Sequence, residues 1–466
     1  VSTRISQATR QVDLLERWGV IFRRDSDGIP LVRKAAGHSK PRLTGAGDAM
    51  VRETQQVLEE QCLHQGVVRR GDQIPMELVH THQSVHGIIV LDLSTGLLVP
   101  LQSKAIIIAD GGFEGAWNNS PVGLGIDIAM RAGLALRDLE FVAWSPLSVE
   151  GTNITLPLGL LADGATLHQS NGSPIEVDIY SDTTKLATAI SSHSNAVLDL
   201  RNLGESSKWW NQTSELITTR LGIDITRQTI PIQPRINTTL GGITTDEHGR
   251  AISGKWSRWF TGLYAAGDAA SSGLHGAGMV AGNRLLDALA GGDAAGKHAA
   301  EYCSKTAHSG RGAIELSSGA CEADLDMDLA PAEGAVQRAG ALYARLNEIM
   351  NHSMGASRNE KDLVSAIDSL TELLLSADDV HIDDYSRLFN TNLLDVMRLK
   401  ASIRLSLAAT RSALARTESR GTHQRADFEE SDDEQLHHTL IDADGNISQL
   451  ALRKGPSGTW VLSPGA

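Results

Sequence analysis

The chain is poor in cysteine and has no long apolar run. Its 466 residues include three cysteines, Cys62, Cys303 and Cys321, which are far apart and form no CxxC pair. This pattern encodes neither an iron–sulfur cluster nor a zinc ribbon, and no metal site is predicted. The longest apolar runs, such as 105–109 and 156–162, are much shorter than the roughly 20 residues that span a bilayer. We therefore expect a cytoplasmic location, with any membrane association made through a partner.

Positive charge is also scarce. The sequence has 42 Lys and Arg against 56 Asp and Glu, for a formal net charge of -14. Such a charge repels phosphate backbones, so nucleic acid is not an expected partner. No basic and apolar leader follows Val1, so the sequence predicts no signal peptide. The length predicts several units with large hydrophobic cores.

Periodicity indicates three kinds of region. Helical patterns occur at 12–18 and 48–65, separated by a long irregular segment, 25–47. Strand-like runs follow at 87–93 and 105–109, and a segment rich in Gly, Ser, Thr and Pro, 144–194, indicates an inserted second domain.

Helical periodicity dominates the later part of the chain. It starts from Pro331 and continues through 341–350, 363–375 and 393–415, which predicts a separate helical domain. Before it, small residues at 276–298 predict a closely packed helix. Gly276 to Ala281 also fits a GxGxxA dinucleotide fingerprint, but no buried strand precedes it directly. The purely structural interpretation of that segment is therefore favoured.

Two apolar runs end in glycine and aspartate, as strands that line a nucleotide often do. They are Ile106 to Gly112 and Leu263 to Asp268, and Leu240 to Asp246 lies between them. Together these motifs resemble the succinate dehydrogenase and fumarate reductase flavoprotein subunits. The resemblance runs nearly end to end. It includes 18–20, 37–38, 46–48, 136–142, 198–200, 274–277, 282–283, 415–423 and 432–434.

The resemblance implies an α/β plus α fold. It predicts a Rossmann-like FAD-binding domain lacking its first βαβ part, an inserted capping domain and a C-terminal helical domain. The expected boundaries are 1–144 and 233–305 for the FAD-binding type domain, 145–232 for the capping domain, 330–423 for the helical domain and 424–466 for a C-terminal domain.

The same resemblance implies FAD as the cofactor. The residues expected near it are Gly111, Gly112, Gly267, Asp268, His275 and Asn283. Asp268 ends a strand and is expected to hold the flavin nucleotide. A chain complete as given would retain FAD poorly, because the family's first phosphate-binding turn precedes Val1.

The charged residues with which the family binds and protonates a dicarboxylate have no counterpart here. Their positions are taken by Ser145, Leu158, Leu161, Thr183, Asn237 and Met279. None of these side chains can balance a carboxylate, and an apolar pair would reject a dianion. The sequence therefore predicts a degenerate active site with no catalytic residue assigned.

Several polar residues have ordinary structural interpretations that we favour. His38 and His275 are expected to be structural. Arg416, Arg420 and His423, with Glu418 nearby, are expected to form a solvated network at a helix end. His437 and His438, beside a run of acids, are expected to belong to a charged surface.

Two functions remain open. The first is a flavin-dependent oxidoreductase that acts on something other than succinate or fumarate. The alternative is a non-catalytic structural paralogue that docks an iron–sulfur electron-transfer subunit. Bound flavin in the purified protein would favour the first, and a colourless folded chain would favour the second.

Overall fold

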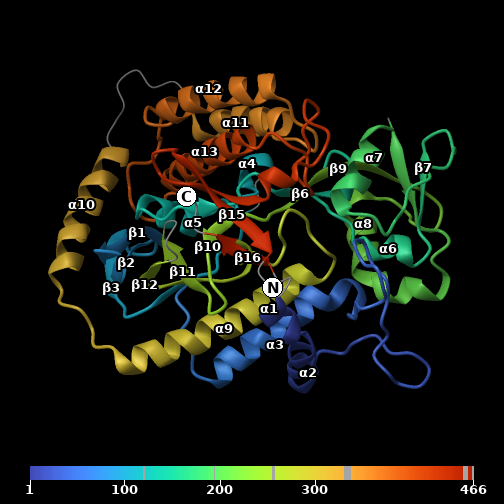
Figure 1. Ribbon diagram of the computed structural model, residues 1–466, viewed down its shortest axis with the longest axis horizontal. Helices are drawn as coiled ribbons and strands as arrows, with labels where there is room; N and C mark the ends of the chain where they lie inside the picture. Colours follow the sequence, from blue (N-terminus) through green and yellow to red (C-terminus); the bar gives the residue numbers. More distant parts are fainter. Residues whose placement is uncertain (119–120, 194, 254–257, 330–336, 455–459, 464–466) are drawn as a thin grey trace.

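The computed structural model describes residues 1–118, 121–193, 195–253, 258–329, 337–454 and 460–463. The expected α/β plus α class is confirmed: β-sheets form the centre, a helical cluster covers one side, and a smaller α/β unit projects from another (Figure 1). The predicted start of the helical domain, at 330–331, lies outside the described residues.

The first sheet combines an antiparallel meander with a short parallel pair. The meander is β1 (Gln73–Thr81), β2 (Ser84–Asp92) and β3 (Leu97–Gln102), and the parallel pair is β4 (Ile106–Ile108) beside β12 (Arg258–Ala265). β11 (Arg250–Ser253) joins the far edge of β12. Because β4 and β12 run parallel, the residues that follow them emerge at the same edge of the sheet.

The second sheet unites distant parts of the chain. Its order is β13 (Ala270–Ser271), β10 (Gly242–Thr244), β5 (Leu136–Arg137), β14 (His437–Ile441), β15 (Ile447–Lys454) and β16 (Trp460–Ser463). The C-terminal strands are therefore part of a sheet shared with the central segments.

The inserted unit has its own sheet and core. β6 (Val142–Val149) and β9 (Ile230–Thr239) form the paired strands by which the chain enters and leaves it, and β8 (Ala196–Asp199) and β7 (Thr166–Gln169) complete the sheet. Helices α6 (Gly159–Ala162), α7 (Thr183–Ser191) and α8 (Asn211–Leu221) pack around it. We call this part the capping unit.

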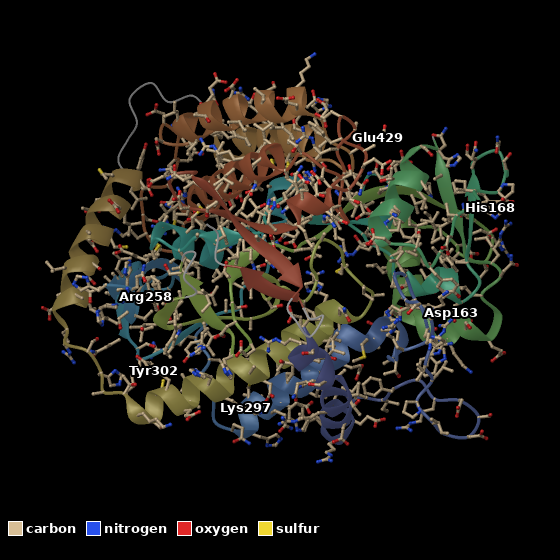
Figure 2. The ribbon with its side chains drawn as sticks, viewed as in Figure 1. Asp163, His168, Arg258, Lys297, Tyr302 and Glu429 are labelled. Carbon is tan, nitrogen blue, oxygen red and sulfur yellow. The ribbon has the colours of Figure 1, made fainter. Side chains whose placement is uncertain are left out.

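The irregular segment after α2 ties the first domain to the capping unit. The carboxylate of Asp163, at the end of α6, lies 3.0 Å from Nη1 of Arg23 and 2.5 Å from Nη2 of Arg33. The indole Nε1 of Trp210 donates to the same carboxylate at 2.9 Å. Figure 2 labels Asp163 where the capping unit faces the N-terminal part of the chain.

The N-terminal helices pack against α9 (Asn283–Lys305), which in turn lies against β12 of the first sheet. They are α1 (Ser2–Ser6), α2 (Ala8–Trp18) and α3 (Met50–His64), and α9 crosses them (Figure 1). The helix predicted from Gly276 begins later than expected, at Asn283. The left-handed backbone of Gly276 (φ 56°) and Gly282 (φ 85°) keeps 276–282 in a loop.

The helical cluster consists of α11 (Ala339–Ser353), α12 (Glu360–Ser376) and α13 (Thr391–Ala415), with α10 (Gly312–Leu329) lying along the meander. The short helices α4 (Gly115–Asn118) and α5 (Leu124–Arg131) lie between the cluster and the sheets. One hydrophobic core runs through both regions, since Leu263 of β12 and Leu399 of α13 belong to it. Of the helices in the described ranges, none is sufficiently long and apolar to span a membrane.

Candidate functional site

Three distant segments of the chain meet at the loop 276–282, which we call the central loop. Its Ala277 carbonyl accepts a hydrogen bond from the backbone N–H of Thr422 at 2.7 Å. Its Ala281 carbonyl lies 2.9 Å from Nε2 of His38. A Cβ atom placed on Gly278 would lie 3.2 Å from Oδ2 of Asp182, the N-cap residue of α7. The loop therefore connects the N-terminal segment, the capping unit and the C-terminal region.

Four of the six predicted substrate positions lie on adjoining elements around this loop. Ser145 is on β6, Asn237 on the paired strand β9, and Thr183 is the first residue of α7, which packs across both strands. Met279 is in the central loop and is buried in an apolar cluster with Phe141. The structure thus groups three uncharged polar side chains with one thioether.

The other two positions lie elsewhere. Leu158 is the N-cap residue of the short helix α6, and Leu161 lies within that helix. Both pack in the hydrophobic core of the capping unit. Leu161 is buried there with Leu147 and Leu198. These two leucines therefore stabilise the capping unit and do not face the central loop.

The predicted cofactor residues follow two parallel strands and precede a helix. Gly111 and Gly112 come after β4, Gly267 and Asp268 come after β12, and Asn283 begins α9. Since β4 and β12 are neighbours, the two glycine-containing ends lie together. Gly267 has a left-handed backbone, φ 65°, that places Asp268 in a short 3-10 turn.

Asp268 is not a free carboxylate. Its Oδ2 accepts hydrogen bonds from Nε of Arg284 at 2.6 Å and from Nη2 at 2.5 Å. The second oxygen, Oδ1, makes no hydrogen bond to the part of the chain that the structure describes. One side of the carboxylate is thus neutralised by Arg284 and the other can accept from a ligand hydroxyl.

The sequence patterns did not identify two residues of this site, Glu114 and Arg284. Glu114 is buried, its Oε1 accepts from the backbone N–H of Thr239 at 2.8 Å, and burial raises its pKa. The sequence signal for Glu114 was an acid two residues after the Gly111–Gly112 pair. Arg284 follows the predicted Asn283 directly, yet only the fold shows that its partner is Asp268.

His275 belongs to the same group of side chains. Its Nε2 lies 3.6 Å from Oδ2 of Asp287, and that carboxylate also accepts from the Ser272 hydroxyl at 2.8 Å. Burial holds the pKa of His275 below its usual value, so the imidazole is neutral near pH 7.

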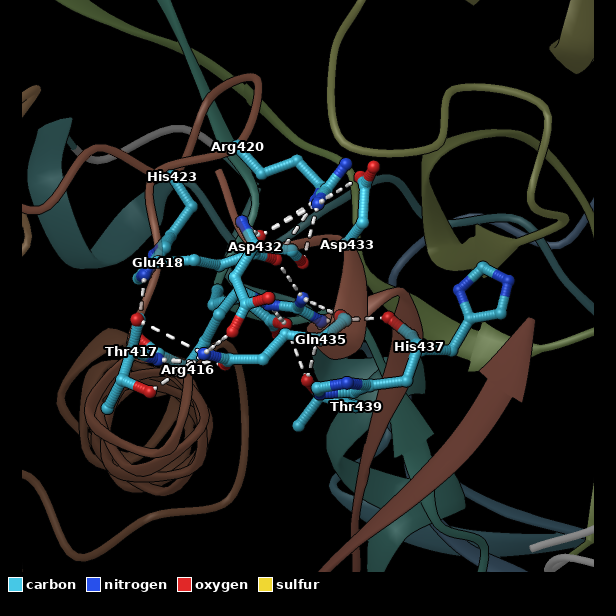
Figure 3. A network of polar contacts seen from close by, with 12 residues as sticks. Arg416, Thr417, Glu418, Arg420, His423, Asp432, Asp433, Gln435, His437 and Thr439 are labelled. Carbon is cyan, nitrogen blue, oxygen red and sulfur yellow. Dashed lines mark hydrogen bonds and ion pairs between the residues drawn. The ribbon is translucent and has the colours of Figure 1, made fainter. Parts of the chain in front are cut away.

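Of the residues expected to form a solvated network, Arg416, Glu418 and His423 are instead buried, and only Arg420 is partly exposed (Figure 3). Arg416, 1% exposed, donates to Oε1 of Glu140 and to Oε1 of Glu418, each at 2.8 Å. Glu418 also accepts from Nε and Nη2 of Arg420 and from the backbone N–H of Asp432. The expectation of a solvated helix end was wrong because β14 returns over α13 and covers it.

His423 completes this network. Nη1 of Arg358 donates to its Nδ1 at 2.9 Å, which leaves the proton on Nε2, where it is donated to the Arg416 carbonyl. Burial, followed by the nearby guanidinium groups, holds the pKa of His423 well below its usual value. We call Glu140, Arg358, Arg416, Glu418 and His423 the junction network.

The expectation of a charged surface at His437 and His438 was also wrong. His438 is mostly buried, and its Nδ1 lies 2.5 Å from Oδ2 of Asp138. Burial lowers the pKa of His437 to about 4, so its imidazole is neutral. Figure 3 shows that the His437 imidazole is turned away from the junction network, while its carbonyl accepts from Arg416.

Comparison with known proteins identifies the family. Residues 1–285 match the FAD binding domain model, and residues 343–457 match the model for the fumarate reductase flavoprotein C-terminal region. The chain belongs to the succinate dehydrogenase and fumarate reductase flavoprotein family. This is the family that the sequence motifs resemble.

Individual relatives cover nearly the whole chain. The fumarate reductase flavoprotein subunit of Mycobacterium tuberculosis is 28% identical over 95% of this chain and 82% of its own length. The succinate dehydrogenase flavoprotein subunit of Coxiella burnetii is 29% identical over 98% and 84%. A solved Escherichia coli quinol fumarate reductase chain superposes with a TM-score of 0.86 at 27% identity, covering 96% of this chain and 82% of that one.

Membership of this flavoprotein family indicates FAD as the cofactor, and the side chains present fit it. Gly112 must lack a side chain, because a Cβ there would lie 2.3 Å from Oγ1 of Thr239 and 2.7 Å from Oε1 of Glu114. Oε2 of Glu114 and Nδ1 of His275 are buried without a hydrogen-bond partner among the described residues. Such atoms are suited to the polar edge of a flavin nucleotide.

In this flavoprotein subunit the residues that would hold FAD are therefore Gly112, Glu114, Gly267, Asp268 and His275. The cofactor would supply hydride or electron transfer. The chain would contribute binding through Oδ1 of Asp268 and a neutral imidazole at His275.

Proposed function

We propose that this flavoprotein-family subunit neither reduces fumarate nor oxidises succinate. The observation that carries the proposal is the residue composition where β6, α7 and β9 of the capping unit adjoin the central loop, which we call the capping interface. Ser145, Thr183, Asn237 and Met279 lie on adjoining elements, and none of them is cationic. Binding of a C4 dianion requires positive groups to replace its hydration, and a buried dianion without them is strongly disfavoured.

Further packing details support this proposal. Met279 lies in the apolar cluster with Phe141 and Leu240, so the central loop presents a thioether where a guanidinium would have to stand. The Oγ1 of Thr183 and the Nε1 of Trp144 are buried without a hydrogen-bond partner among the described residues. Neither group is an acid able to protonate a carbon, so proton delivery to fumarate lacks a donor.

The direct test is turnover of the purified, FAD-supplemented chain with fumarate and a reduced viologen, and with succinate and an artificial acceptor. Each missing charged hydrogen bond costs about 3 to 4 kcal/mol of transition-state stabilisation, so activity should fall below detection. Flavin content, measured from the visible absorbance of the same sample, separates loss of the cofactor from loss of the substrate site. Turnover at ordinary dehydrogenase rates would refute the proposal.

A second candidate is that the chain docks an iron–sulfur subunit without itself carrying out chemistry. It is supported by the continuous core between the helical cluster and the sheets, which does not involve the central loop. The relatives are named as flavoprotein subunits, that is, as parts of larger assemblies. Arg416 is buried and cannot form a docking surface, whereas the Arg420 side chain is 22% exposed.

Copurification tests this candidate. The chain would be expressed with an iron–sulfur subunit and isolated through a tag on the chain. Stable capture with no bound flavin would favour docking alone. Failure to capture the subunit with a correctly folded, flavin-loaded chain would argue against it.

A further inference from the structure

A large cavity adjoins the central loop, whose Gly276 and Ala277 are among its lining residues. Its volume is about 960 Å³, which is within the range of small-molecule sites. Its lining residues include members of β10, β5, β14 and β15, which are neighbours in the second sheet, and of the segment after β13. None of the predicted cofactor or substrate residues is among its lining residues.

One end of the cavity is polar and contains a buried arginine. Arg137 is 4% exposed, and it donates through Nε to Oγ of Ser271 at 3.0 Å and through Nη2 to the Ser271 carbonyl. Its Nη1 makes no hydrogen bond to any residue that the structure describes. The nearest carboxylate, that of Asp138, is 3.9 Å from Nε and already binds His438.

Two hydroxyl groups at the same end also lack partners. Oγ1 of Thr244 and Oγ1 of Thr245 are buried and make no hydrogen bond within the described chain. Both residues line the cavity beside Arg137, as do Gly273 and Gly276. A buried guanidinium with one nitrogen, Nη1, left without an acceptor among the described residues and two buried hydroxyls without partners there are costly unless a ligand completes their hydrogen bonds.

A neighbouring wall of the cavity is apolar, and its Leu440 is the cross-strand partner of Arg137. This wall is formed by Phe141 and by leucines of the C-terminal hairpin, namely Leu436, Leu440, Leu450 and Leu452. The His437 imidazole at this wall is neutral, so it adds no charge. The cavity therefore joins a cationic, hydroxyl-rich end to a hydrophobic surface.

The other charged lining residues are already compensated. Arg250 lies 2.6 Å from Oδ2 of Asp246, and Arg420 lies 2.9 Å from Oε2 of Glu418. Arg4 is 3.6 Å from Asp287, and Glu247 is an exposed acid that lies 3.8 Å from His248. Arg137 is thus the lining arginine with the longest contact to its acid partner.

We propose that this cavity binds an amphipathic monocarboxylate, with its carboxylate on Arg137, Thr244 and Thr245 and its hydrocarbon body on Phe141 and the leucines. Arginine recognises a carboxylate by charge-assisted hydrogen bonds, and apolar contact supplies the remaining affinity. The site is separate from the proposed function and does not depend on it.

The test is isothermal titration calorimetry on the folded chain with octanoate, octanamide and acetate. Octanoate should bind at least tenfold more tightly than octanamide, which keeps the chain but lacks the charge, and at least tenfold more tightly than acetate, which keeps the charge but lacks the chain. Arg137→Gln should abolish the preference for octanoate over octanamide. Arg345→Gln, which alters an exposed arginine on α11, is the control and should change neither affinity.

Arg137 is buried, so its replacement could prevent folding. Thr244→Val is the second variant, because it removes a hydroxyl without a partner and keeps the side-chain shape. It should weaken octanoate binding at least threefold and octanamide binding by less, because the neutral amide carbonyl is the weaker acceptor. Equal binding of octanoate and octanamide, equal binding of octanoate and acetate, no binding of any probe, or unaltered octanoate affinity in Thr244→Val would each overturn the proposal.

Discussion

Two junctions between parts of this molecule differ in the polar side chains that they bury. One buries paired charges, and the other buries uncharged groups. At the junction network, Arg416 and Glu418 are fully buried and each charge is paired. At the capping interface, Ser145, Thr183 and Asn237 are uncharged, and the Thr183 hydroxyl has no partner in the described structure. The comparison shows that buried charges are kept where the protein supplies both signs. At the predicted substrate positions, which we propose do not bind a dicarboxylate, the side chains are uncharged.

The variant with the largest expected change in stability is Glu418→Gln. It removes the carboxylate shared by Arg416 and Arg420, and breaking a buried pair of this kind costs about 3 to 5 kcal/mol. The measurement is the shift in the urea unfolding midpoint. Glu372→Gln removes an exposed partner of Arg345 and should cost at most about 1 kcal/mol. Equal shifts for the two variants would mean that burial does not distinguish the networks.

Asp268 and Arg284 provide an intermediate case, an ion pair beside a ligand site. Asp268→Asn keeps the shape but weakens acceptance from a ribose hydroxyl, and we expect about tenfold weaker FAD binding, or about 1.4 kcal/mol. Flavin fluorescence during titration with FAD measures the affinity. Circular dichroism should show an unchanged fold. Undiminished FAD affinity would remove Asp268 from the binding site.

The junction network also predicts a dependence of stability on pH. His423 remains neutral in the folded chain because its pKa is held well below the usual 6.5. As pH falls below about 6.5, the unfolded chain binds a proton that the folded chain does not, so stability falls by about 1.4 kcal/mol per pH unit. The loss continues down to the folded pKa.

His423→Gln should make this acid limb of the stability curve shallower by about 1.4 kcal/mol per pH unit, measured as urea midpoints between pH 7 and pH 5. His437 and His275, whose pKa values are also lowered, should keep their share of the slope. The control is His352→Gln, since His352 is on the outer surface of α11 with a side chain that is 71% exposed. A curve of unchanged slope in His423→Gln would show that other groups cause the acid sensitivity.

The smallest expected effect concerns the capping interface. Thr183→Val removes a buried hydroxyl without a partner, so it should stabilise the chain by about 1 kcal/mol. Thr239→Val is the matched variant, because the Thr239 hydroxyl accepts from the Phe113 backbone N–H at 3.2 Å. That change should cost about 1 kcal/mol. Destabilisation by both variants would indicate that Thr183 has a partner in solution.

Much of the fold could be predicted because its signals are local. The apolar run before Gly111 and Gly112 and the periodicity of α13 depend on neighbouring residues only. Pairing between distant segments could not be predicted in this way. Nothing near Arg416 in the sequence indicates that β14 would return and bury it, and Leu158 and Leu161 could not be placed in the capping core by counting residues.

The ion pairs of Asp163 with Arg23 and Arg33 limit how the capping unit can move. β6 and β9 enter and leave the unit as one antiparallel pair, which would act as its hinge. The segment carrying Arg23 and Arg33 forms a second tether well away from that hinge. Rotation about the hinge alone would pull both guanidinium groups from the Asp163 carboxylate in the same step, whereas the Trp210 indole, which belongs to the capping unit, would move with that carboxylate. The unit should therefore open rarely and cooperatively, and amide hydrogen exchange along β6 and β9 would report how often it does.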